Sequence, residues 1–133
     1  MAQPTFETLH VYQLAERLAN EVWNVVIQWS TFAQDTVGKQ FVRAADSVGS
    51  NLAEGYGRGS YADSKRFVLI SRGSLNETIC CLRRASTRNL ITPEQSKCLF
   101  TITDELGPRL NAYLNFIIKQ LKNHEIRGET PTG

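Results

Sequence analysis

The stretch that decides the fold is residues 37–77, V37-G-K-Q-F-V-R-A-A-D-S-V-G-S-N-L-A-E-G-Y-G-R-G-S-Y-A-D-S-K-R-F-V-L-I-S-R-G-S-L-N-E77. Apolar and small residues recur at three- and four-residue spacing up to residue 54, which predicts an amphipathic helix. A loop with glycines at 55, 57 and 59 follows, and Ser60 with Asp63 is typical of a helix start. Because the connection is short, the pattern predicts two antiparallel neighbouring helices, at about 36–54 and 61–89.

The residues facing inward on these two helices are small as well as apolar. Gly49 inside a helix costs about 1 kcal/mol relative to alanine, so we expect close helix packing there. Gly55 fits the left-handed position just after a helix end. The expected inward face of 61–89 consists of Phe67, Ile70, Ser71, Ser74, Leu75, Thr78, Leu82 and Ala85.

Polar residues on the packed faces allow two interpretations, a buried hydrogen-bond network that fixes the helix register, or surface binding. These residues are Ser47, Asn51, Ser74, Asn76 and Glu77. In the first interpretation Asn51 and Glu77 would meet near the closed end of the hairpin.

Two further helices are expected on either side of this hairpin. The first spans about 9–29, with Thr5 or Thr8 as its N-cap, and Asp35 or Thr36 would cap the second. Thr92-Pro93-Glu94-Gln95 opens a fourth helix at about 93–122. Pro108 predicts a kink near Asp104, and residues 123–133 lack an apolar stripe and should fray.

The first helix carries a second apolar strip beside its core face. The strip consists of Tyr12, Ala19, Trp23 and Ile27. A helix exposed to water on its outer side would not need this strip, so either the helix is deeply sandwiched or its flank meets another subunit. Leu69, which falls within a basic face of the third helix, is a further hint of a contact between subunits.

Length and composition place these helices in one all-α domain, 1–133, in the form of an antiparallel up-down-up-down four-helix bundle. The 133 residues are 41% hydrophobic and 21% charged, as in soluble globular proteins. No apolar run is long enough to span a membrane, and the start does not resemble a secretion signal. Cys80, Cys81 and Cys98 form no disulfide or metal pattern, so we expect reduced thiols and a cytoplasmic protein.

Positive charge is concentrated in the central hairpin. Residues 39–88 hold nine Lys or Arg and four Asp or Glu, a net charge of +5 within a chain of +2. This basic face is the best functional lead, because arginine suits phosphate groups. The candidate nucleic-acid-binding residues are Arg58, Lys65, Arg66, Arg72, Arg83, Arg84 and Arg88. The alternative is a solvated face whose cations pair with acids on neighbouring helices or subunits.

Catalytic patterns are missing from the sequence. The Gly55–Ser60 loop has glycines and Arg58, yet no strand precedes it and no Gly-Lys-Ser/Thr occurs, so a tight turn is the simpler interpretation than a phosphate cradle. The two histidines, His10 and His124, lie near opposite ends of the chain and complete neither a di-iron motif nor a catalytic triad. We therefore expect a protein that is not an enzyme and has no cofactor or metal.

Three segments carry a family resemblance. They are F6-E-T-L-H-V-Y-Q-L-A15, R43-A-A-D-S-V-G-S-N-L-A-E-G-Y-G-R-G-S60 and F67-V-L-I-S-R-G-S-L-N-E-T78. With these segments, over about residues 6–121, the chain resembles the bacterial four-helix bundle proteins, also known as 23S rRNA intervening-sequence proteins. The N-L-A-E-G and G-S-L-N-E segments at this separation are its specific part.

The resemblance implies antiparallel bundles that associate into rings, commonly pentamers, encoded within insertions in ribosomal RNA genes. It also implies a remote relation to the accessory variability determinant of diversity-generating retroelements, a basic ring that binds nucleic acid and a reverse transcriptase. In such a ring Tyr12, Ala19, Trp23, Ile27 and Leu69 would line the contact between subunits. Two hypotheses follow: a homo-oligomer that binds structured RNA or DNA, or a protein-interaction scaffold without nucleic acid.

Overall fold

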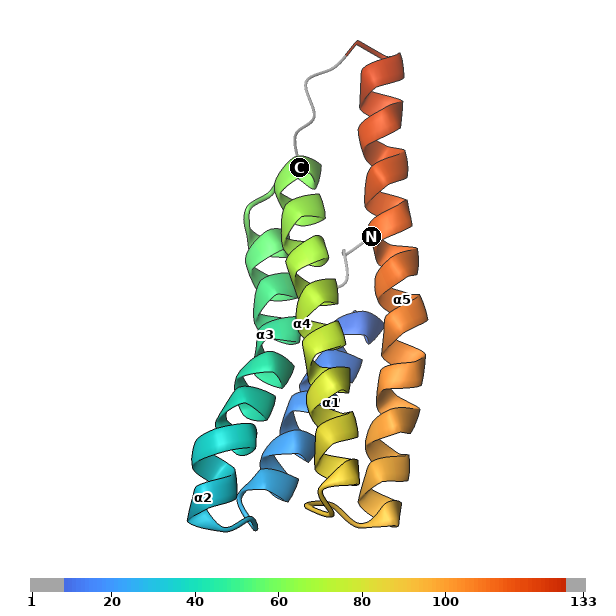
Figure 1. Ribbon diagram of the computed structural model, residues 1–133. Helices are drawn as coiled ribbons and strands as arrows, with labels where there is room; N and C mark the ends of the chain where they lie inside the picture. Colours follow the sequence, from blue (N-terminus) through green and yellow to red (C-terminus); the bar gives the residue numbers. More distant parts are fainter. Residues whose placement is uncertain (1–8, 129–133) are drawn as a thin grey trace.

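Residues 9–128 are described by the computed structural model, and within them the fold is all-α with four long helices and no strand. The long helices are α1 (His10–Val26), α3 (Lys39–Gly57), α4 (Tyr61–Thr87) and α5 (Pro93–Ile126) (Figure 1). A short corner between α1 and α3 contains α2 (Thr31–Ala33) and the π-helical turn η2 (Gln34–Gly38). Helix α1 packs against α3 and α5, and α4 packs against the same two helices. None of the described helices has the length and apolar character needed to span a bilayer.

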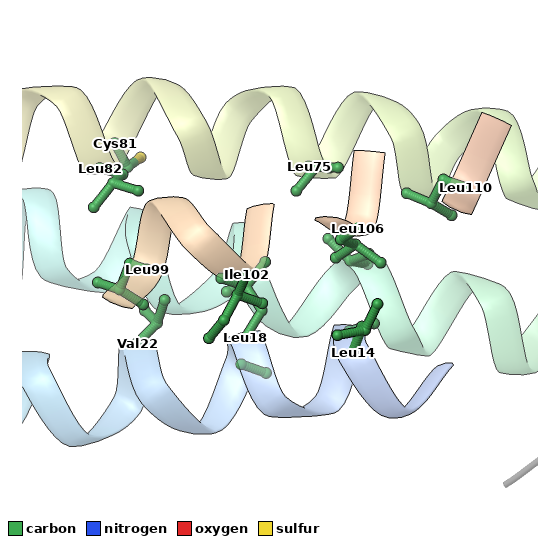
Figure 2. Packing of buried hydrophobic residues seen from close by; sticks show 14 of the residues in the cluster. Leu14, Leu18, Val22, Leu75, Cys81, Leu82, Leu99, Ile102, Leu106 and Leu110 are labelled. Carbon is green, nitrogen blue, oxygen red and sulfur yellow. The ribbon is translucent and has the colours of Figure 1, made fainter. Parts of the chain in front are cut away.

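The core lies where the apolar stripes of the four long helices converge. Figure 2 shows Leu14, Leu18 and Val22 of α1 facing the α5 stripe, with α4 residues on the other side. Leu18, Val22 and Leu106 are fully buried. Burial of side chains of this size stabilises the fold by about 1.5–3 kcal/mol each. The core face of α1, beside its second apolar strip, therefore points into the bundle.

Helix α4 is rotated slightly from the expected inward face. Ile70, predicted to face inward, is exposed, whereas Val68 and Cys81 are buried. The reason is that one line of residues along α4 packs against both α3 and α5. This line consists of Ser64, Val68, Ser71 and Leu75. The predicted face contained Ser71 and Leu75 of this line but placed Ile70 in the core and left out Ser64 and Val68.

The first corner of the chain differs from the expectation. Helix α1 ends at Val26 rather than near residue 29, and the Gln34 side-chain amide donates to the carbonyl oxygens of Val26 and Ile27, both at 3.1 Å. The next helical segment starts at Thr31 because the Ser30 hydroxyl caps the backbone N–H of Ala33. Asp35 and Thr36 therefore lie inside a helix and are not caps, and the candidate caps Thr5 and Thr8 lie outside the described residues.

The glycine loop is shorter than expected because α3 continues to Gly57. Gly55 is buried inside the helix, so the prediction of a left-handed Gly55 is wrong, and Gly59 has the positive φ of 76°. A Cβ on Gly55 would lie 2.8 Å from Cβ of Phe67, and the Ser64 hydroxyl donates to the Gly55 carbonyl at 3.0 Å. Gly55 thus serves close packing of α3 on α4. Ser60 caps α4 through the Asp63 N–H, as predicted.

The remaining helix ends are set by local signals. Helix α4 ends at Thr87, two residues before the predicted end at Asn89. Asn89 takes the left-handed conformation with φ of 57°. Thr92 and Gln95 form the predicted capping box of α5. Helix α5 runs to Ile126, so the expected fraying from residue 123 is wrong for 123–126, and 129–133 lie outside the described residues. Pro108 lies within this continuous helix, and the kink near Asp104 stays a prediction.

Small polar side chains form hydrogen bonds where α3 packs against α4. Ser74 donates to Ser47 at 2.8 Å between the two hydroxyls, and Asn51 donates to the Ser47 carbonyl and hydroxyl. Three of the five expected residues, Ser47, Asn51 and Ser74, thus form a half-buried network, whereas Asn76 and Glu77 are exposed and Asn51 does not reach Glu77. Glu77 is exposed and instead accepts a hydrogen bond from Gln40 at 3.4 Å.

Candidate nucleic-acid interface

All seven predicted binding residues are exposed; they lie on α4, on the loop before it or, for Arg88, directly after its last residue. The structure does not gather them into one patch. Arg58, Lys65 and Arg66 lie at the start of α4, and Arg83, Arg84 and Arg88 lie at its end. The two groups are about 27 Å apart along the helix axis, from Lys65 to Arg83 at 1.5 Å per residue.

Two flanks of α4 carry these cations. By helical spacing, Lys65, Arg72 and Arg83 share the flank nearer to α5, and Arg66 and Arg84 share the other. The Arg72 guanidinium confirms the first flank, because it donates to the side-chain oxygen of Asn111 on α5 at 3.5 Å. A ligand that lies along α4 could therefore meet cations on both of its edges.

Two of the arginines are held in place at the start of α4. Arg58 pairs with Glu54 at 3.0 Å, and Arg66 pairs with Asp63 at 3.5 Å. Both guanidinium groups also lie over the ring of Phe67, at 5.4 and 4.8 Å from its centre. Exposed ion pairs contribute only about 0–1 kcal/mol, so a phosphate group could displace these carboxylates.

The other cations have no such partner within residues 9–128. No described carboxylate oxygen lies within 4.0 Å of the charged nitrogens of Lys65, Arg83, Arg84 or Arg88. The alternative of an intramolecular ion-paired face therefore fails for these four residues within the described chain. Their charge is available to an anion or to another subunit.

The middle of the outer α4 face is apolar and open. Leu69 and Ile70 are exposed, and Gly73 lies between the two groups of cations. A Cβ added to Gly73 would meet no heavy atom within 4 Å. A glycine within a helix is unfavourable by about 1 kcal/mol, and no packing within the described chain explains this one.

The residues expected at a subunit contact lie in different environments. Trp23 and Ile27 are 55% and 52% exposed, and Leu69 is exposed on α4. Tyr12 is half-buried beside Gly49, as expected for close packing of α1 on α3. Ala19, by contrast, is buried in the core, with only 6% of its surface exposed.

Sequence reasoning missed two groups of exposed aromatic side chains. Phe32 in the corner before α3 is 78% exposed and follows the Trp23 and Ile27 strip along the chain. Tyr56 and Phe116, at the opposite end of the bundle, are 44% and 49% exposed. Tyr56 lies seven residues after Gly49, on the face of α3 that contacts α1. This spacing was the signal in the sequence from which the position of Tyr56 could have been predicted.

The described residues bring together no group of three potential metal ligands from His, Cys, Asp and Glu side chains. Cys80 is exposed, Cys81 is buried and Cys98 is half-buried, all as free thiols. Burial raises the pKa of the Cys81 thiol, with smaller contributions from Glu77 and Cys80, while Arg84 opposes them. Cys81 is therefore a core side chain and a poor nucleophile.

Comparison with known proteins supports the resemblance. The fold is similar to a crystal structure of a protein of unknown function from the S23 ribosomal protein family of Bacteroides thetaiotaomicron VPI-5482. The two share 23% identity with a TM-score of 0.69, over 78% of this chain and 97% of the other. No curated protein matches the chain. The family model described as "23S rRNA-intervening sequence protein" matches residues 7–112, which is most of the chain, and the chain therefore belongs to this family.

Proposed function

We propose that this protein is a non-enzymatic homo-oligomer that binds nucleic acid, in particular structured RNA, by charge and shape through the outer face of α4. The observation that carries the proposal is the set of four exposed cations, Lys65, Arg83, Arg84 and Arg88, which lack a carboxylate partner in the described chain. Phosphate groups satisfy such cations and release counterions on binding. The name of the family refers to 23S rRNA, which is consistent with an RNA ligand.

The proposal includes the arrangement of the helices. Each long helix packs against two others, and the α3–α4 and α4–α5 connections are short. These neighbours and loop lengths support an up-down-up-down order, with α5 bent near Pro108.

Self-association has its own support. Trp23, Ile27 and Phe32 expose large apolar side chains near one end of the bundle. Exposed apolar groups of this size favour a contact between proteins. We propose a ring, with five subunits as the expected number, in which the modest basic face of each subunit is multiplied. Cytoplasmic location is part of the same proposal.

The deciding experiment is a salt titration of RNA binding with the Arg72→Glu/Arg83→Glu/Arg84→Glu variant. Its control, Arg17→Glu/Lys39→Glu/Lys97→Glu, changes the charge equally on exposed residues outside α4. We expect the α4 variant to lose RNA affinity. The slope of log affinity against log salt concentration should also become shallower by about 2–3 units, whereas the control should keep most of the affinity and of the slope. Equal affinity of wild type and the α4 variant would overturn the proposal.

A second candidate, a protein-interaction scaffold, is favoured by the same Trp23, Ile27 and Phe32 surface. If the arginines serve subunit contacts instead of RNA, the α4 variant breaks the oligomer in light scattering. Wild type then shows no RNA shift at about 150 mM salt. A reverse transcriptase as partner is part of this candidate only, and co-purification of the two proteins would test it.

A further inference from the structure

A cavity lies between α1 and α5, two helices that pack against each other. Its volume is about 310 Å³. Sites for small molecules in proteins range from about 300 to 1,000 Å³, and most of their walls are apolar. The wall of this cavity is also mostly apolar, and the cavity is open to solvent. It therefore has the size and the character of a site for a small organic molecule.

The position of the cavity follows from how α1 and α5 are aligned. The His10 ring lies 3.1 Å from the Glu105 carboxylate. Seven residues further along α1 is Arg17, and seven residues back along α5 is Cys98, and both line the cavity. The cavity is therefore about 10 Å along the helices from the His10–Glu105 contact. The side chains of Cys98 and Thr101 are short, and they leave space between the helices that a longer side chain would fill.

The α5 side of the cavity is one stripe of residues. Glu94, Lys97, Cys98 and Thr101 follow one another at spacings of three and four residues, so their side chains share one helix face. Cys98 is half-buried and packs against the hydrophobic core, whereas the other residues of the stripe are exposed. The Thr101 hydroxyl donates to the Lys97 carbonyl at 2.8 Å. The cavity thus has an apolar floor and a polar rim.

Two cations on this rim come from opposite walls. Arg17 belongs to α1 and Lys97 to α5, and both are exposed. No described carboxylate oxygen lies within 4.0 Å of the charged nitrogens of either residue. Glu94 is the acid among the described lining residues, so the rim has a net charge of +1. The charge of the rim therefore favours a ligand with a single negative charge.

An apolar floor beneath two unpaired cations fits an organic monoanion. The apolar body of such a ligand releases water from the floor, and its carboxylate can meet the Arg17 fork from one wall and the Lys97 ammonium from the other. An inorganic anion would make no use of the floor. We propose that the cavity between α1 and α5 binds a small monocarboxylate with a short aliphatic or aromatic body. This inference does not depend on RNA binding by α4.

The Cys98 thiol offers a direct readout, because a ligand in the cavity covers it. Alkylation by iodoacetamide can be followed at Cys98 by tandem mass spectrometry of tryptic peptides. The exposed Cys80 on α4 is the internal control in the same sample. Hexanoate should suppress alkylation of Cys98 as its concentration rises, without a change at Cys80. Hexanamide has the same shape without the charge and should protect Cys98 at much higher concentrations alone.

Substitutions on the rim test the role of charge. Arg17→Gln/Lys97→Gln should raise the hexanoate concentration for half-protection by about tenfold or more, the loss expected for a hydrogen bond to a charged group. The matched control, Lys39→Gln/Arg43→Gln, removes two exposed cations from α3 and should leave this concentration unchanged. Glu94→Gln should lower it, because the substitution removes a negative charge beside the carboxylate. All five positions are exposed, so the variants should fold as wild type does.

Several outcomes would overturn the inference. Hexanoate that leaves the Cys98 rate unchanged, or that protects Arg17→Gln/Lys97→Gln as well as wild type, would do so. A Cys98 that reacts as slowly as the buried Cys81 without any ligand would mean that another copy of the chain covers the cavity. Weaker hexanoate binding in Glu94→Gln would also contradict the inference, because a like charge beside the ligand cannot hold it in place.

Discussion

Ser71 on α4 donates a hydrogen bond from its hydroxyl to the backbone carbonyl oxygen of Val48 on α3, at 2.8 Å. Ser71 is 0% exposed, so water does not compete for this bond. A hydroxyl that bonds a helical carbonyl of another helix needs the two backbones to lie close. This bond and the Ser64–Gly55 bond therefore fix how far apart α3 and α4 lie.

Removal of the Ser71 hydroxyl should destabilise the protein by about 1–2 kcal/mol, because Ser71→Ala loses the bond while Val48 keeps its bond within the helix. Urea denaturation at fixed protein concentration measures the free energy of unfolding. Ser50→Ala is the matched control, because the exposed Ser50 hydroxyl bonds only the Asp46 carbonyl of its own helix. Equal losses in both variants would argue against a special role for the buried bond.

The two buried glycines of α3 should respond differently to alanine. At Gly55 the new Cβ would lie 2.8 Å from Cβ of Phe67 and 3.3 Å from Cα of Ser64, so α4 itself would have to move. Such overpacking typically costs about 1–3 kcal/mol. At Gly49 the close atom is Oε1 of Glu16 at 2.6 Å, the end of a flexible side chain that can turn away. Gly49→Ala should therefore leave the free energy of unfolding unchanged or raise it by up to about 1 kcal/mol. A larger loss of stability in Gly49→Ala than in Gly55→Ala would contradict this explanation.

Gly73→Ala should stabilise the isolated chain and weaken its proposed complex. The added methyl group meets nothing within 4 Å and improves helix propensity, so the free energy of unfolding should rise by up to about 1 kcal/mol. If RNA lies along the outer face of α4, a bulkier Gly73→Leu should reduce duplex affinity without a change in charge. Calorimetry and a gel shift on the same samples measure the two effects. Duplex affinity unaffected by Gly73→Leu would place the ligand elsewhere.

The phenol of Tyr113 should lose its proton at a higher pH than the phenol of an exposed tyrosine. Burial raises its pKa above the usual value of 10.0. The folded state then holds this proton more tightly than the unfolded state, so the stabilisation is complete below about pH 10 and declines as the pH rises further. The absorbance of tyrosinate should show a late component that Tyr113→Phe removes. The same variant should flatten the loss of stability above pH 10, and an unaltered titration curve would refute the assignment.

Local signals in the sequence predicted the parts of the fold that depend on neighbours along the chain. Ser60 caps α4 and Thr92 with Gln95 caps α5, as their spacing indicates, because capping joins residues three positions apart. The seven candidate cations are exposed as expected, since charged side chains on the far side of an amphipathic helix face water. The family assignment likewise came from contiguous segments.

Errors arose where a residue's role depends on a distant part of the chain. Gln34 ends α1 because its side chain reaches back to the carbonyls of Val26 and Ile27, and apolar periodicity carries no signal of this contact. Ile70 looked like a core residue, and only the position of α4 between α3 and α5 leaves it outside.

Patterns within the sequence predicted that this protein consists of long amphipathic helices, where most of them begin, and that its positive charge lies along the α3–α4 hairpin. These properties depend on hydrogen bonds and periodicity within about four residues. Only the packing of the helices fixed that Gly55 is a packing residue, that Ala19 is buried and that Ile70 is exposed. Those outcomes depend on which helix faces meet, and the free energy of that choice comes from side chains far apart in the chain.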